Sequence, residues 1–92
     1  MENTRQRTCV PIGFQKDAIA SLEAELDRRL DEKGSGTFAS THEILGVLTE
    51  EHTELIEAVR SNAVSDVRKE LLDIAVGCVF AVACIDAQTL DW

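Results

Sequence analysis

Apolar residues recur along most of this chain at the three- and four-residue spacing that places them on one face of an α-helix. A first helix is predicted over residues 16–33. Its apolar positions are Ile19, Leu22, Leu26 and Leu30. Residues 1–15 contain Pro11 and Gly13, which disfavour a helix, and are expected to form an irregular arm. The glycines of residues 34–36 should end the first helix and open a loop.

A second helix is predicted to begin after Ser40, because Ser40 and Glu43 have the S-x-x-E spacing of a capping box. It should continue to about Arg60. Its apolar stripe consists of Ile44, Val47, Leu48, Leu55 and Val59. A third helix is predicted from Ser65, a suitable N-cap residue, to about Ala87.

The predicted fold is all-α, with an irregular arm over residues 1–15 and a single helical domain over residues 16–92. The connection between the second and third helices has only about four residues, so these helices should be antiparallel neighbours. The third helix is apolar nearly all round over residues 71–85, and such a helix must be buried on most sides. Because one short chain cannot cover that surface, we expect a homodimer or homotetramer whose chains together form a helical bundle.

The composition supports helices and argues against nucleic-acid binding. Aromatic residues make up only 4% of the chain and there is one proline, so a turn-rich β fold is disfavoured. The formal net charge is -8, which repels phosphate backbones. The basic residues of the first helix are interleaved with acids and form no basic stripe, so we expect no binding to DNA or RNA. They are Lys16, Arg28, Arg29 and Lys33.

Neither a secretory leader nor a membrane span is predicted. Residues 1–10 are polar and lack the apolar core of a signal peptide. The longest apolar run, residues 74–85, has twelve residues, whereas a span needs about twenty. The cysteines Cys9, Cys78 and Cys84 include no C-x-x-C pair, so they indicate neither a disulfide framework nor a zinc site. A cytoplasmic location is therefore expected.

Four acids form the strongest candidate site. Glu51 and Glu54 on the second helix, and Glu70 and Asp73 on the third, are each three residues apart. This spacing places each pair on one helix face. Counted from the connecting turn, Glu54 and Glu70 lie roughly 9 and 7.5 Å along their helices, and Glu51 and Asp73 roughly 13 and 12 Å. In an antiparallel hairpin the two pairs therefore sit at matching heights.

Grouped carboxylates repel one another, and a hard divalent cation relieves that repulsion. Mg²⁺ prefers oxygen ligands, which favours a magnesium site, with Mn²⁺ as the alternative metal. The competing interpretation is a solvated acidic helix face, which is the more common meaning of clustered glutamates; the matched heights favour the metal site. A di-iron site is disfavoured because neither His42 nor His52 follows a glutamate by three residues.

The acids also resemble a family signature. The sequence reads E-E-x-x-E over residues 50–54, then fifteen intervening residues, then E-x-x-D over residues 70–73. This pattern resembles that of the MazG-like all-α nucleoside triphosphate pyrophosphohydrolases, and the similarity covers about residues 41–86. The resemblance implies a house-cleaning type of nucleotide pyrophosphohydrolase, which hydrolyses a nucleoside triphosphate to the monophosphate and pyrophosphate. It also implies Mg²⁺ as cofactor and a site in a helical bundle, commonly completed by a second subunit.

The resemblance assigns roles to individual residues. It implies that the metal ligands are Glu51, Glu54, Glu70 and Asp73. Glu50 matches the first acid of the motif and is expected to position or deprotonate the attacking water. Lys69 and Arg68 are expected to hold phosphate oxygens, although ordinary surface charges would look the same. The alternative function is a non-catalytic helical oligomerisation or regulatory module that retains the acids.

Overall fold

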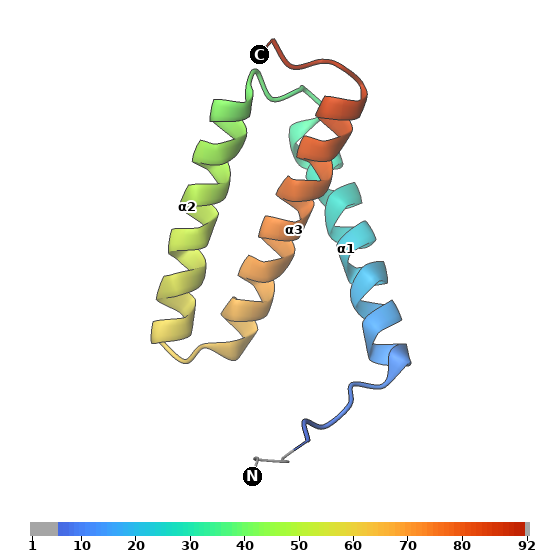
Figure 1. Cartoon of the computed structure of the whole chain (residues 1–92), viewed down its shortest axis with the longest axis vertical. Coiled ribbons are helices and arrows are strands. Elements are labelled where there is room, and N and C mark those ends of the chain that lie inside the picture. Colours follow the sequence, from blue (N-terminus) through green and yellow to red (C-terminus); the bar gives the residue numbers. More distant parts are fainter. Residues whose placement is uncertain (1–5, 92) are drawn as a thin grey trace.

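The computed structural model describes residues 6–91, which contain three α-helices and no strand (Figure 1). They are α1 (Ile12–Lys33), α2 (Thr41–Arg60) and α3 (Val64–Asp86). The all-α prediction is therefore confirmed. α1 begins four residues before the predicted start at Lys16. Pro11 precedes its first residue with φ −58°, which suits a helix start, and one glycine in the first turn costs a helix only about 1 kcal/mol.

The predicted capping box begins α2. The Ser40 hydroxyl accepts a hydrogen bond from the Glu43 backbone N–H at 3.2 Å. The Glu43 carboxylate reaches back and accepts one from the Ala39 N–H at 2.6 Å. These two bonds satisfy N–H groups that have no partner within the helix, and they fix where α2 starts.

A tight turn reverses the chain between α2 and α3. Asn62 has φ 57°, a left-handed conformation that asparagine tolerates better than most residues. Its N–H donates to the Val59 carbonyl at 3.1 Å, and the Ala63 N–H donates to the Ala58 carbonyl at 3.2 Å. This pair of bonds is a Schellman motif. The prediction of Ser65 as N-cap is wrong, because Ala63 precedes the first residue of α3 and no side chain caps that end.

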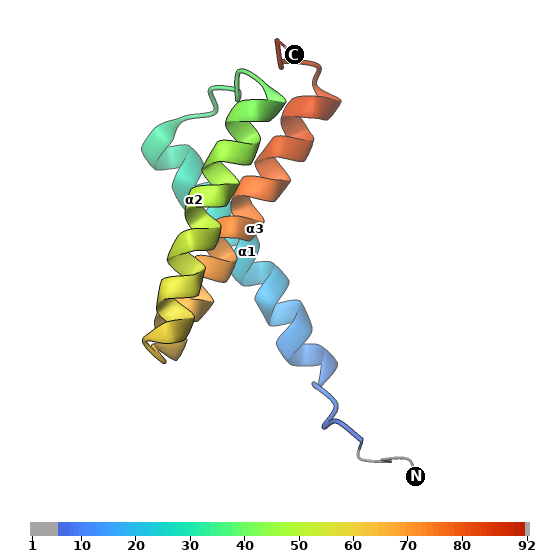
Figure 2. The ribbon, with the colours of Figure 1, turned by 60° about the vertical axis from the view of Figure 1, so that its left-hand side comes forward.

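α2 and α3 run side by side in opposite directions, and α1 packs against α3 (Figures 1 and 2). The buried apolar side chains come from α2 and α3 and are Ala58, Val76, Ala81 and Cys84. No residue of α1 is buried. Of its four predicted apolar positions, Ile19 is exposed and the other three are half-buried, namely Leu22, Leu26 and Leu30. The N-terminal half of α1 diverges from the other helices (Figure 2).

The single chain is elongated, with extents of 53 × 27 × 27 Å. Its radius of gyration is 16.4 Å, whereas a compact domain of this length has about 12 Å. The apolar third helix is incompletely covered within one chain, since Leu71, Val82 and Ile85 are each more than half exposed. Over residues 6–91, no helix is long and apolar enough to cross a membrane.

The segment between α1 and α2 is fastened to the C-terminal residues. The Asp91 N–H donates to the Ala39 carbonyl at 2.7 Å, and the hydroxyls of Thr37 and Thr89 are 2.6 Å apart. Phe38 also packs edge-on against Phe80 of α3, with ring centroids 5.7 Å apart. These contacts hold the loop beside the C-terminal half of α3.

Candidate functional site

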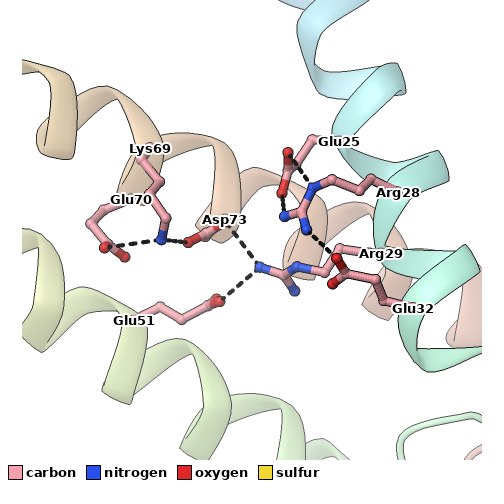
Figure 3. Close-up of polar contacts among 8 residues, drawn as sticks. All are labelled: Glu25, Arg28, Arg29, Glu32, Glu51, Lys69, Glu70 and Asp73. Atoms are coloured by element: carbon pink, nitrogen blue, oxygen red, sulfur yellow. Dashed lines mark hydrogen bonds and ion pairs between the residues drawn. The ribbon is translucent and has the colours of Figure 1, made fainter.

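Asp73 lies at the centre of a charged cluster where all three helices meet (Figure 3). Only 8% of the residue is exposed. One carboxylate oxygen, Oδ1, is 3.0 Å from Arg29 Nη2, and the other, Oδ2, is 3.2 Å from Lys69 Nζ. A buried carboxylate is costly unless it is paired, and here each oxygen has its own cation.

Glu51 and Glu70 lie on either side of Asp73. Glu51 Oε2 is 3.7 Å from the same Arg29 nitrogen, and Glu70 Oε2 is 3.7 Å from Lys69 Nζ. The second oxygen of each glutamate, Oε1, is buried and has no hydrogen-bond partner among the described residues. α2 and α3 thus supply carboxylates to one site, and α1 reaches it through Arg29.

The pKa values of the cluster reflect burial and crowding. Burial raises the pKa of Glu51, and the carboxylates of Asp73, Glu54 and Glu70 raise it further, while Arg29 opposes them. The hydrogen bond to Asp73, together with its negative charge, raises the pKa of Lys69. The site therefore has an excess of negative charge that its own cations do not fully compensate.

The other residues predicted for the site lie further out. Glu54 and Glu50 are exposed on α2, although Glu54 is near enough to influence the pKa of both Glu51 and Lys69. Arg68 points to α1, where its guanidinium donates to the Ser21 hydroxyl at 3.2 Å. The structure thus brings together three of the four proposed metal ligands, with the fourth at their edge.

Arg29 is a site residue that the sequence analysis missed. It lies among alternating charges on α1, so its charge alone does not distinguish it from surface residues. Its helix phase does, because it follows Leu22 by seven residues and Leu26 by three. That spacing places Arg29 at the edge of the apolar face that packs on α3. The helix phase is therefore the sequence feature that could have predicted its position in the site.

A cavity of about 270 Å³ adjoins the cluster. It lies between α1, the loop that follows it, α2 and α3. Arg29 and Glu51 contribute to its wall next to the acids. Its apolar wall is formed by Leu26, Leu30, Phe38, Val47, Val76 and Phe80. An apolar cavity with charged groups at one side suits a ligand that has an apolar part and a charged part.

The donor atoms fit a hard divalent cation. Every candidate ligand is a carboxylate, and Glu51 Oε1 and Glu70 Oε1 are buried oxygens without a hydrogen-bond partner in the part of the chain described. Oxygen-only donor sets favour Mg²⁺, Mn²⁺ and Ca²⁺ over softer metals. Within residues 6–91, however, no three acid, histidine or cysteine side chains are grouped closely enough to hold an ion as they stand.

The fold and the site define an all-helical protein with a carboxylate cluster between two antiparallel helices. The chain belongs to the MazG nucleotide pyrophosphohydrolase domain family, whose family model matches residues 39–91, more than half of its length. This match covers α2, α3 and all four acids, and it confirms the family resemblance. Searches among curated proteins and among solved structures gave no match.

Proposed function

We propose that the protein is a metal-dependent nucleoside triphosphate pyrophosphohydrolase that forms a nucleoside monophosphate and pyrophosphate. Family membership supports hydrolysis of a nucleotide pyrophosphate bond. The observation that carries the finer proposal is the grouping of buried Asp73 with half-buried Glu51 and Glu70 between α2 and α3, beside an apolar cavity. A charged cluster beside an apolar cavity supports the proposal, because a triphosphate would need the first and a base and sugar the second.

The proposed metal ligands are Glu51, Glu54, Glu70 and Asp73, and the proposed metal is Mg²⁺, with Mn²⁺ as the alternative. When bound, the metal supplies positive charge against the triphosphate and lowers the pKa of a coordinated water. Two buried glutamate oxygens without a hydrogen-bond partner among the described residues support this assignment, because ligation would satisfy both.

The chain's own side chains then orient the substrate and the water. The Lys69 side chain is 66% exposed while its ammonium group contacts the acids, so it can also donate a hydrogen bond to a phosphate oxygen of a bound substrate. Arg68 is adjacent and is proposed to assist it. Glu50, exposed on α2, is proposed to position the attacking water or take its proton. The apolar cavity is proposed to exclude water from the nucleoside.

We also propose that the protein works as a homodimer or homotetramer in the cytoplasm and binds neither DNA nor RNA. The exposed apolar residues of α2 and α3 support self-association. The net charge of -8 supports the absence of nucleic-acid binding. The alternative, a helical oligomerisation or regulatory module without activity, uses the same surfaces but needs no metal.

A screen of ribo- and deoxyribonucleoside triphosphates with Mg²⁺ separates the two functions. The expected result is release of pyrophosphate and monophosphate from at least one nucleotide. Asp73→Asn should lower that rate by orders of magnitude, because it removes a metal ligand. Asp86→Asn, an exposed acid on the same helix, is the matched control and should retain activity. No hydrolysis of any nucleotide would support the non-catalytic alternative.

A further inference from the structure

The acidic cluster contains two cations of its own. Arg29 and Lys69 contact three of the four carboxylates, and Asp73 contacts both cations. Four carboxylates against two cations leave two negative charges in excess. The protein therefore already holds part of the positive charge that a metal ion would bring.

Arg29 lies between two of the proposed metal ligands, Glu51 and Asp73. Its Nη2 atom lies between Glu51 of α2 and Asp73 of α3, at 3.7 and 3.0 Å from their oxygens. Figure 3 shows its guanidinium reaching between the two carboxylates. A cation that binds Glu51 and Asp73 together needs oxygens at about 2.1 Å, so it cannot share that space with a guanidinium.

Arg28 provides an internal comparison. It is next to Arg29 on α1, but its guanidinium pairs with Glu25 and Glu32 of the same helix and forms no ion pair with Glu51, Glu70 or Asp73 (Figure 3). The two arginines have the same charge and differ in which carboxylates they contact. An effect of Arg29 that Arg28 lacks is therefore an effect of position in the site.

We propose that Arg29 is an internal counter-ion that competes with the metal for Glu51 and Asp73 and must leave them when the metal binds. Arg29 thereby weakens the affinity for metal. In the metal-free protein its positive charge offsets the repulsion among the carboxylates. This inference rests on the metal-binding part of the proposed function. Because Arg29 is on α1, metal occupancy is coupled to the contact between α1 and the α2–α3 pair.

The test measures binding of Mn²⁺ alone, without nucleotide, by electron paramagnetic resonance and calorimetry. Arg29→Gln should bind Mn²⁺ at least about tenfold more tightly than wild type, since it removes a unit charge next to two ligands. Arg28→Gln should bind as wild type does. Equal or weaker binding by Arg29→Gln would overturn the proposal, because a residue that only positions the ligands weakens binding when removed.

A second measurement uses the wild-type chain and does not depend on whether the variant folds. Arginine modification by phenylglyoxal, followed by peptide mass spectrometry, should become faster at Arg29 when Mn²⁺ is added and remain unchanged at Arg28. Unchanged or slower modification of Arg29 in protein that binds Mn²⁺ would overturn the proposal. If neither the wild-type chain nor Arg29→Gln binds Mn²⁺, the metal-dependent function fails as well. If Mn²⁺ binds but no nucleotide is hydrolysed, only the proposed function fails.

Discussion

At the residue scale, Asp73 holds the site together because it joins α1 to α3 through charge. Arg29 and Lys69 each contact one of its oxygens. From the sequence alone, removing an acid from the cluster would be expected to relieve repulsion. The structure argues otherwise for Asp73, since its removal leaves two cations with more distant partners.

Asp73→Asn should therefore destabilise the metal-free protein by about 1–3 kcal/mol, the usual cost of losing hydrogen bonds between charged groups. It should also abolish the rise in melting temperature that Mg²⁺ produces in wild type by binding the folded state. Thermal melts with EDTA and with Mg²⁺ measure both effects, and Asp86→Asn is the control. A variant that is as stable as wild type and still responds to Mg²⁺ would contradict the role assigned to Asp73.

Glu51 makes the stability of the metal-free protein depend on pH. Burial raises its pKa, and neighbouring carboxylates add to the effect. Folding therefore favours the protonated acid, whose contribution is fully present below the unfolded pKa and is lost as pH rises through the folded pKa. Glu51→Gln remains neutral throughout. Its free energy of unfolding, measured with urea in EDTA, should match wild type near about pH 4 and exceed it near about pH 8.

Glu50→Gln is the control for this titration, because Glu50 precedes Glu51 in the sequence but is exposed. Its difference from wild type should be small at both pH values. If the advantage of Glu51→Gln instead shrinks as pH rises, ionised Glu51 stabilises the fold and burial does not raise its pKa.

At the element scale, local capping chemistry predicts the start of α2 but not that of α3, which begins after Ala63 without a side-chain cap. The capping box at Ser40 and Glu43 predicts the start of α2. The structure contains the bond from the Glu43 N–H to Ser40, and the Glu43 carboxylate accepts from Ala39, one residue before the N-cap. The start of α1 is less predictable, because Pro11 both disfavours a helix interior and suits a helix start. Arg29 could not be assigned from charge, since its partners are on other helices, far along the chain.

Gly77 of α3 lies where side chains of α2 pack closely against it. A Cβ atom at this position would lie 3.3 Å from Glu51 Oε1 and 3.3 Å from Leu48 Cδ2. Gly46 on α2 is the matched comparison, because a Cβ there would meet no atom within 4 Å. Glycine at position 77 thus leaves room for the Glu51 carboxylate within the site.

Gly46→Ala should raise the free energy of unfolding by about 0.5–1 kcal/mol, because alanine favours a helix more than glycine does. Gly77→Ala should gain less than this or lose stability, and it should reduce the Mg²⁺-dependent rise in melting temperature by displacing Glu51. Urea unfolding and thermal melts of the two variants test this directly. Equal gains with an unchanged Mg²⁺ response would show that Gly77 does not shape the site.

At the scale of the whole molecule, one chain leaves much of the apolar surface of α3 exposed. Val79, Val82 and Ile85 on α3 are 41–55% exposed, and the chain is more extended than a compact domain. An apolar surface of this kind marks an interface, and a second copy of the chain is the proposed partner.

Sedimentation equilibrium should therefore give a dimer or tetramer at micromolar concentration. Val82→Asp should shift the distribution towards monomer, because an aspartate is costly to bury in an apolar interface. Val10→Asp, which changes an exposed residue outside the helices, should have no effect. A wild-type chain that sediments as a monomer would contradict the proposed assembly.

The proposed function requires the acidic cluster to direct water to the α-phosphorus of a nucleoside triphosphate. Hydrolysis in isotopically labelled water, with Mg²⁺ and the best substrate of the screen, tests it most directly, because mass spectrometry shows which product carries the new oxygen. Attack at the α-phosphorus places the label in the nucleoside monophosphate and leaves the released pyrophosphate unlabelled. Label in pyrophosphate or in inorganic phosphate, or no turnover of any nucleotide, would contradict the claim.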